Sequence, residues 1–280
     1  MKVYSFNANT PFEFEIKELY EITQAKRKIS GVPHRANFYQ IVWIESGKSV
    51  QTVDFNPVEV IGGQILSIAK NQVISFDTST NYKGQIILFT DLFFNRCECD
   101  ARFMKQLNLF NPFAGNMPLN VNEKLEILWG MMKNEFQSEQ DTFHSNAIHN
   151  FLSAFLIEAV RQNTENRTQI HNIEYQTAIR FADLVEQNFT SLRKVNDYLP
   201  LMNTTAKPLS KSLQKTIGKT PKQFIDDRIL LEAKRLLAYS NESIKEITFL
   251  IGFDEPTNFS KFFREQTGIS PAEFKKQHLS

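Results

Sequence analysis

The sequence predicts an α+β protein in which β-structure comes first and helices follow. Three observations predict this fold class. Short runs rich in β-branched and aromatic residues recur roughly every ten residues through the first part of the chain. After Pro118, apolar residues at helical spacing replace them. Near the end, one segment occurs twice, which indicates a duplicated helical unit.

The strand-like segments are separated by turn residues, and we expect residues 1 to about 110 to be strands. The segments are Phe38–Ile44, Ser49–Phe55, Gln64–Ile68, Val73–Phe76 and Gln85–Phe89. The expected turns are Ser46-Gly47, Asn56-Pro57, Gly62-Gly63, Asn71 and Asn81 to Gly84. This spacing favours a small antiparallel barrel or sandwich.

Two helices are expected next, at residues 121–136 and 142–161. Asn120 or Asn122 is the expected N-cap of the first. The second has a wide apolar face. Such a face can pack on the barrel, on a second copy of the protein, or on both.

A polar segment without apolar periodicity follows, and it is interpreted as a linker. We therefore expect three parts: a domain at 1–163, a linker at 164–173 and a helical domain at 174–280. In the helical domain, Thr220 and Ser270 are typical N-caps, each followed by proline at the first helical position. Thr220 is expected to open a long helix, Pro221 to about Tyr239.

Composition describes a soluble globular protein, with 41% hydrophobic and 22% charged residues. The net charge of +1 divides into −2 for residues 1–173 (16 basic, 18 acidic) and +3 for residues 174–280 (16 basic, 13 acidic). No apolar leader and no run of about 18 apolar residues is visible, so we expect a cytoplasmic protein without membrane contact. Cys97 and Cys99 are the only cysteines. Their spacing is short for a disulfide and matches no common zinc pattern, so we expect two reduced structural thiols.

The repeated segment is Ser210–Phe224 (SKSLQKTIGKTPKQF) and, 50 residues later, Ser260–Phe274 (SKFFREQTGISPAEF). A shorter helix and a tight turn precede each copy. The helices are Val195–Met202 and Ile244–Ile251, and the new N-caps are Thr205 and Asp254. Helix, tight turn and capped helix form the helix-turn-helix pattern, whose second helix enters the DNA major groove. Gly252 lies where the second turn needs a positive φ.

The segment SIKEITFLIGFDEPTNFSKFFREQTGISPAEF is similar to the signature of the AraC/XylS family of bacterial transcription regulators. GKTPKQFIDDRILLEAKRLL resembles the other half of the same DNA-binding domain, so the resemblance covers about residues 174–280. Pro33-His34, Gly47, Gly62–Ile68 and Ile86–Phe89 resemble, more loosely, the family's cupin-like sensor barrel. The helices at 121–161 fall where relatives dimerise.

The resemblance implies two recognition helices, spaced by Pro221–Tyr239, in successive major grooves of double-stranded DNA. It also implies a homodimer through helices 121–161, and RNA polymerase as a partner if the chain is an activator. Position by position, it assigns base-facing roles to Lys207, Ser210, Lys211, Thr257, Asn258, Ser260 and Lys261, and phosphate contacts to Lys215, Lys219 and Arg264. For any one of these residues, the alternative to a DNA contact is a position on a helix face that is simply exposed to solvent.

Three residues depart from the family pattern. Pro200 lies inside a predicted helix, which is therefore expected to be short or kinked. Pro208 lies in the first turn of the first recognition helix, where proline is tolerated. Thr248 stands where relatives usually have a small alanine before the glycine-phenylalanine turn. These changes make base recognition by the first copy less secure than by the second.

An enzyme is not expected. His34 is the only histidine in the barrel region, and one ligand cannot hold a catalytic metal. No phosphate-binding or nucleophile motif is present, and no cofactor is expected. A barrel lined by aromatic residues can instead bind a small organic effector. The candidate lining residues, chosen from strand position, are His34, Phe38, Gln40, Trp43 and Phe76. Two alternatives stay open: a filled barrel that serves only dimerisation, and a protein that uses the same helices to bind a partner other than DNA.

Overall fold

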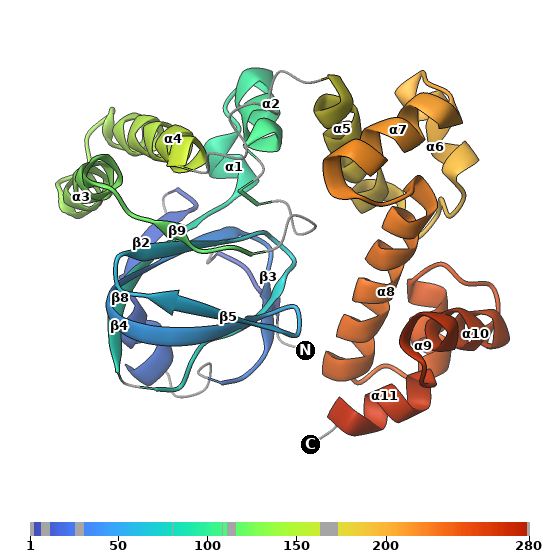
Figure 1. Cartoon of the computed structure of the whole chain (residues 1–280). Coiled ribbons are helices and arrows are strands. Elements are labelled where there is room, and N and C mark those ends of the chain that lie inside the picture. Colours follow the sequence, from blue (N-terminus) through green and yellow to red (C-terminus); the bar gives the residue numbers. More distant parts are fainter. Residues whose placement is uncertain are drawn as a thin grey trace. The chain divides into compact units, whose positions relative to one another are not determined.

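The computed structural model describes residues 3–6, 12–25, 31–79, 81–107, 109–110, 116–162 and 173–278. The chain divides into two compact units, Lys2–Arg167 and Thr168–Ser280. The first unit carries the strands and the second consists of helices (Figure 1). This confirms the α+β class with an N-terminal sheet and a C-terminal helical part. Residues 163–172, which include nearly all of the expected linker, lie outside the described residues.

Nine strands form the sheet of the first unit, with one π-helical turn, η1 (Glu21–Ala25), after β2. Their order is β1-β3-β7-β4-β6-β9; β8 pairs with β4 and β2, and β5 pairs with β4. Among the described strands β1 does not pair with β9, so the predicted barrel is not closed. The strands are β1 (Val3–Tyr4), β2 (Phe14–Glu18), β3 (His34–Ala36), β4 (Tyr39–Val53), β5 (Asn56–Ile61), β6 (Gln64–Ile68), β7 (Val73–Ser75), β8 (Tyr82–Phe89) and β9 (Leu119–Asn120).

The long strand β4 corrects the predicted turn at Ser46-Gly47. The chain runs straight through this dipeptide, with a β-bulge between Ile44 and Ser46 against β8. Gly47 has a φ of +84°, and a Cβ there would lie 2.0 Å from the Asn81 carbonyl oxygen. Glycine is therefore needed for close backbone approach inside a strand rather than for a hairpin. The hairpin turn lies at Asp54-Phe55, where both φ angles are positive, and the predicted turn residues Asn56-Pro57 instead begin β5.

Side chains of β4 alternate between two environments, as a pleated strand requires. Val42 and Ile44 are fully buried in a core shared with Leu66, Ile68 and Ile86. Trp43, between them in sequence, points to the other face. Its ring meets the Trp129 ring edge-on, with centroids 5.1 Å apart. The sheet is therefore packed on both faces at this point.

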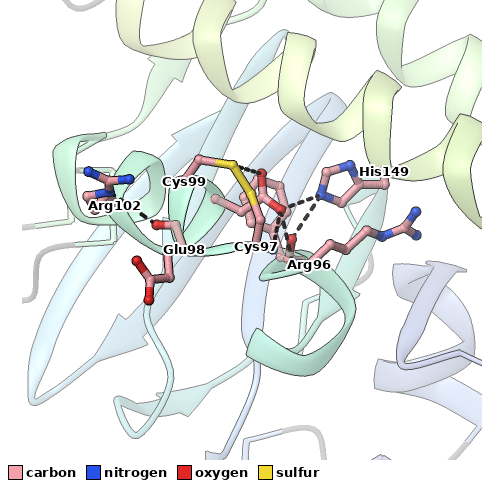
Figure 2. Close-up of a disulfide and its surroundings, with 8 residues drawn as sticks. Arg96, Cys97, Glu98, Cys99, Arg102 and His149 are labelled. Carbon is pink, nitrogen blue, oxygen red and sulfur yellow. Dashed lines mark hydrogen bonds and ion pairs between the residues drawn. A yellow bond between two sulfur atoms is a disulfide. The ribbon is translucent and has the colours of Figure 1, made fainter.

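Residues after β8 are helical, which corrects the expectation that the chain stays in strands to about residue 110. Helix α1 spans Asp91–Phe94 and α2 spans Glu98–Gln106. At the start of α2 the structure joins Cys97, the N-cap of the helix, and Cys99 in a disulfide (Figure 2). The expectation of two reduced thiols is wrong here. The backbone of Cys97 is extended, and the two Cα atoms lie 5.2 Å apart, within the range that disulfides bridge.

Two helices pack on the sheet, as predicted: α3 (Glu123–Gln137) and α4 (His144–Gln162). Asn122 caps α3 by accepting a hydrogen bond from the Leu125 amide at 2.9 Å. The Trp129 indole donates to the Gln85 amide oxygen of β8 at 2.7 Å, which fixes α3 on the sheet. Large apolar side chains on or beside these helices remain exposed: Ile127 (54%), Met131 (46%) and Phe143 (69%). Phe143 belongs to the wide apolar face predicted for the second helix, whereas Ile127 and Met131 lie on α3.

The second unit consists of seven helices in its described residues. They are α5 (Ile173–Asn188), α6 (Val195–Met202), α7 (Ala206–Ile217), α8 (Pro221–Tyr239), α9 (Ile244–Leu250), α10 (Pro256–Thr267) and α11 (Pro271–His278). Thr220 caps α8 as predicted, in a reciprocal pair of hydrogen bonds with Gln223. No helix of the described part of the chain is long and apolar enough to cross a bilayer.

A buried charge network anchors α8. Arg228 is 3% exposed and donates to Glu186 of α5 at 2.6 and 3.0 Å and to Glu232 at 3.1 Å. Its guanidinium also lies 3.9 Å from the centre of the Phe189 ring. Burial lowers the pKa of Arg228, but the carboxylates of Glu186 and Glu232 outweigh it and raise the pKa overall. The pairing keeps a buried charge satisfied where α5 meets α8.

Candidate functional site

The first copy of the repeat forms α7, which follows α6 across a tight turn. Asn203 ends α6 in the left-handed conformation, with a φ of 49°. Helix α6 is eight residues long and contains Pro200, so the expectation of a short helix is confirmed. Thr205 is the N-cap of α7, as predicted, although its side chain makes no capping hydrogen bond. Gly218 ends α7 with a φ of 70°.

The second copy repeats this arrangement with α9, a turn and α10. Ser243 caps α9, and Gly252 in the turn has the predicted positive φ of 80°. A Cβ on Gly252 would lie 1.7 Å from the Thr190 carbonyl oxygen, so the loop after α5 presses against this turn. The N-cap of α10 is Glu255, one residue later than the predicted Asp254. Gly268 ends α10 with a φ of 81°.

Both second helices bury one face and expose a polar one. In α7, Leu209 and Leu213 are fully buried, and in α10 Phe259 and Phe263 are. The predicted DNA contacts lie on the remaining surface of these two helices, except that Lys219 follows α7 in the loop. The exposed ones are Lys207, Ser210, Lys211, Lys215, Lys219, Thr257, Asn258, Lys261 and Arg264, while Ser260 is half-buried. Gln214, three residues after Lys211, is exposed as well.

The cations of α7 are partly neutralised within the unit. The Lys215 ammonium donates to Glu174 of α5 at 2.8 Å, and the Lys211 ammonium lies 4.0 Å from the same carboxylate oxygen. The hydrogen bond from Lys215 lowers the pKa of Glu174. Lys219 pairs with Asp227 at 2.8 Å. In α10, Lys261 has no ion-pair partner among the described residues. The α10 face is therefore the more available to an anion.

A separate cavity of about 350 Å³ lies in the first unit, against the sheet. Four of the five predicted effector-binding residues line it: His34, Phe38, Gln40 and Phe76. The Gln40 side chain is 2% exposed. The His34 Nδ1–H donates to the Val32 carbonyl at 3.0 Å, and burial lowers the pKa of His34.

Trp43 does not join this group. Strand alternation places it on the face opposite Gln40 and Val42, where it packs against Trp129. From Gln40 to Ile44 the even-numbered positions of β4 face the interior, and after the bulge the odd-numbered positions from Ser49 to Val53 do. Lys17 and Glu15, an ion pair on β2, also line the cavity, and neither was among the predicted lining residues. They lie on β2, which joins the sheet through its pairing with β8 and is distant in sequence from β4.

Comparison with known proteins gives matches of several kinds. Residues 201–277 match the family described as "Helix-turn-helix domain". Curated relatives include the HTH-type transcriptional activator RhaS of Yersinia pestis and of Yersinia pseudotuberculosis. Each is 22% identical over 263 residues and covers 91% of this chain and 93% of the relative.

Solved structures with similarity include ToxT from Vibrio cholerae, with a TM-score of 0.47 and 15% identity over 96% of this chain and 100% of ToxT. A ToxT structure bound to (E)-4-(8-methylnaphthalen-1-yl)but-3-enoic acid has a TM-score of 0.46 and 17% identity over 94% of this chain and 98% of that chain. An AraC-type DNA-binding domain protein from Chromobacterium violaceum has a TM-score of 0.34 and 22% identity over 38% of this chain and 94% of that chain.

The helical unit and its match at 201–277 define a DNA-binding transcription regulator of the helix-turn-helix class. The relatives that match along nearly the whole chain are regulators rather than enzymes, which confirms that the chain is not an enzyme. These matches confirm the resemblance to the AraC/XylS family of bacterial transcription regulators.

Proposed function

We propose that α7 and α10 read DNA together, each in one of two successive major grooves on one face of the duplex. The observation that carries this proposal is their matched construction. Both are 12-residue helices with a polar face, and a left-handed glycine ends each one before the next capped helix. Helix α8, with 19 residues, spans about 28 Å at about 1.5 Å per residue. This length is comparable to the ~34 Å between successive major grooves.

The two helices contribute unequally in this proposal. Thr257, Asn258 and Lys261 lie exposed near the start of α10, the end of a recognition helix that meets base edges. Asn258 is suited to adenine and Lys261 to guanine or phosphate. In α7, Lys211 and Lys215 share Glu174. We therefore assign base recognition chiefly to α10, and mainly phosphate contacts to Lys207, Lys215, Lys219 and Arg264.

We also propose that a small organic effector binds the cavity of the first unit. The aromatic walls supply apolar contact, and the buried amide of Gln40 supplies a hydrogen bond that fixes orientation. Domain limits of 1–163 and 174–280 with a linker between them would let such a ligand act on a separate DNA-binding domain. The cavity favours this function over a barrel that serves only dimerisation.

Dimerisation and activation complete the proposal. Exposed Ile127, Met131 and Phe143 form an apolar surface on and beside α3 and α4 that a second copy would cover. The relatives named RhaS are transcriptional activators. We propose the same role here, with RNA polymerase as the partner at the promoter and the cytoplasm as the site of action.

Selection of binding sites from a randomised duplex library tests the DNA proposal. Lys261→Ala should weaken binding and lower the salt slope by about one, whereas Asn258→Ala should relax preference at one base pair by about 1–3 kcal/mol. Lys276→Ala, at an exposed lysine of α11, is the matched control and should change neither. Recovery of no preferred sequence by the wild type would contradict the proposal.

Thermal unfolding with a panel of small organic metabolites tests the effector proposal. A ligand of the cavity should raise the unfolding temperature of the wild type but not of Gln40→Ala. Gln64→Ala is the control, because its amide donates to Asn120 and does not line the cavity. If no compound separates Gln40→Ala from this control, the barrel serves dimerisation instead.

A further inference from the structure

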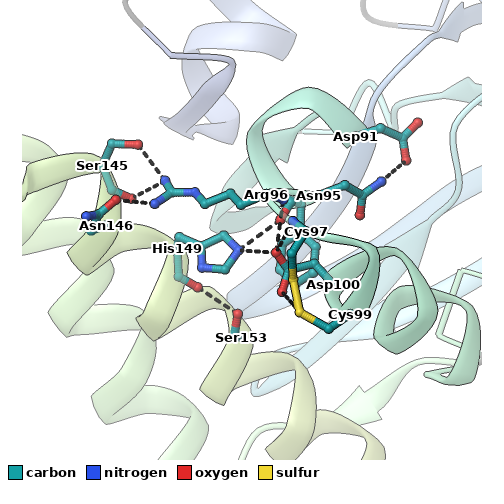
Figure 3. A network of polar contacts seen from close by, with 11 residues as sticks. Asp91, Asn95, Arg96, Cys97, Cys99, Asp100, Ser145, Asn146, His149 and Ser153 are labelled. Atoms are coloured by element: carbon teal, nitrogen blue, oxygen red, sulfur yellow. Dashed lines mark hydrogen bonds and ion pairs between the residues drawn. A yellow bond between two sulfur atoms is a disulfide. The ribbon is translucent and has the colours of Figure 1, made fainter.

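Two cysteines and the carboxylate of Asp100 lie together at the start of α2 (Figure 3). None of the three lines the cavity. The sulfur atoms of Cys97 and Cys99 and a carboxylate oxygen of Asp100 all lie within 4.8 Å of one another. Both cysteines are exposed, so a reductant and an ion can reach them. In the structure the two sulfurs are joined as a disulfide, which leaves no thiolate to act as a ligand.

The carboxylate is held in place before any ion arrives. Asp100 Oδ2 accepts hydrogen bonds from the Arg96 amide at 2.9 Å and from the Cys97 amide at 3.2 Å. The other oxygen, Oδ1, lies 4.0 Å from the Cys99 sulfur. The backbone of the turn thus orients Asp100 so that one oxygen faces the sulfurs.

Neighbouring positive charge is directed elsewhere. Arg96 directly precedes Cys97, but its guanidinium points to the start of α4 (Figure 3). It donates to the Ser145 carbonyl at 2.8 Å, to the Ser145 hydroxyl at 2.7 Å and to the Asn146 side chain. It therefore anchors the turn to α4 without covering the sulfurs. Repulsion of a cation by this arginine is correspondingly reduced.

His149 of α4 supports the carboxylate from behind. Its Nε2 lies 2.8 Å from the Phe94 carbonyl oxygen, which can only accept, so Nε2 carries the proton. The same nitrogen lies 3.7 Å from Asp100 Oδ2 (Figure 3). A protonated Nε2 is not a metal ligand, so His149 acts as a positioning residue for Asp100.

We propose that, once the disulfide is reduced, Cys97, Cys99 and Asp100 bind one thiophilic divalent cation of the zinc–cadmium class. Reduction proceeds by thiol–disulfide exchange: an external dithiol is oxidised to its own disulfide, and the Cys97–Cys99 bond opens to two thiols. The cation then forms two metal–sulfur bonds, and both thiol protons go to solvent. While the two sulfurs are bonded to each other, neither is a thiolate that can bind the metal ion. The disulfide form therefore excludes the ion.

The donor set selects the class of cation. Two sulfurs and one oxygen suit zinc or cadmium, whereas magnesium and calcium take oxygen ligands. Ligands about 2.0–2.3 Å from a tetrahedral ion lie roughly 3.3–3.8 Å apart. The 4.8 Å limit on the present separations is compatible with this after the sulfurs part and the turn closes slightly. Water would complete the fourth position.

Cadmium titration of the full chain tests the site. The protein is reduced with a dithiol, freed of it under nitrogen, and titrated with CdCl₂ while the thiolate-to-cadmium absorption in the ultraviolet is recorded. One ion per chain and two released protons are expected. The oxidised protein should bind no cadmium with this absorption.

Variants separate the proposal from adventitious thiol binding. Cys97→Ser and Cys99→Ser should each abolish tight binding, and Asp100→Asn should weaken it by at least about tenfold while still capping α2. His149→Gln should weaken it less, without changing the number of ions bound. Glu98→Gln, an adjacent carboxylate outside the donor set, is the matched control. Thermal melts of the reduced proteins check that each variant folds. The proposal is overturned if the reduced wild type binds cadmium no more tightly than Cys97→Ser, or if Asp100→Asn behaves like Glu98→Gln.

Discussion

Arg193 lies flat against Phe253, with its guanidinium carbon 3.3 Å from the centre of the ring. It also donates a hydrogen bond to the Gly252 carbonyl at 3.1 Å. Arg193 belongs to the loop between α5 and α6, and Phe253 to the turn between α9 and α10. One side chain therefore connects the part of the unit that carries α7 with the turn that carries α10. Fixed geometry between two recognition helices depends on such contacts.

Removing this side chain should loosen the second turn. We expect Arg193→Ala to lower the stability of the helical unit by about 1–3 kcal/mol, from the lost cation–π contact and hydrogen bond. Urea unfolding followed by far-ultraviolet circular dichroism measures it, while tryptophan fluorescence reports the first unit, which holds both tryptophans. Arg193→Lys keeps the charge but loses the planar stack, so its effect should be intermediate. Unchanged unfolding of Arg193→Ala would show that the contact is incidental.

Gly252 should tolerate no side chain. Gly252→Ala places a Cβ 1.7 Å from the Thr190 carbonyl oxygen, in addition to the cost of a positive φ. Gly268→Ala is a matched control, because its φ of 81° is nearly the same and nothing lies within 4 Å of the added Cβ. The control should cost about 1 kcal/mol. Gly252→Ala should cost clearly more in the same unfolding experiment, and equal costs would mean that the loop after α5 yields easily.

Glu174 should moderate DNA binding by α7. Replacing it by glutamine removes the negative charge that holds Lys215 and Lys211, so both cations become available to phosphates. We expect Glu174→Gln to tighten binding to the selected duplex by roughly twofold to fivefold at low salt. Glu242→Gln, at an exposed carboxylate outside this pair, controls for the change in net charge. Equal affinities for the two variants would contradict a moderating role.

His34 should make the stability of the first unit depend on pH. Burial lowers its pKa below the usual 6.5, so the folded state binds a proton less readily than the unfolded state. Stability is therefore full above about pH 6.5 and falls as the pH drops from there through the folded-state pKa. The unfolding free energies of the wild type and of His34→Gln are measured at pH 7.5 and 5.5. Between these two values the wild type should lose more unfolding free energy than the variant, which has no imidazole to protonate. A difference that does not vary with pH would contradict this account.

The parts that the sequence predicted well are set by local chemistry. Thr220 with the following proline, Gly252 and Asn122 are capping or turn residues whose roles depend on the few residues around them. The strand run at Gln64–Ile68 was predicted for the same reason. The exposed face of α10 followed from helical spacing once the buried Phe259 and Phe263 were recognised.

The parts that failed depend on distant residues. Gly47 looks like a turn residue, but Asn81, far along the chain, requires glycine inside a strand there. The disulfide at Cys97 follows from an extended backbone that the C-x-C spacing does not reveal. Arg193 with Gly252 and Lys215 with Glu174 are 59 and 41 residues apart in sequence. No local pattern predicts such pairs.

The central claim is that α7 and α10 occupy successive major grooves of one duplex. Hydroxyl-radical footprinting on the duplex recovered by selection tests it most directly, at low salt where phosphate contacts are strongest. The account predicts protection on one face of the duplex in two tracts about one helical turn apart, with the tract of α10 lost first in Lys261→Ala. A single protected tract that covers one groove, or protection that does not respond to Lys261→Ala, would contradict it.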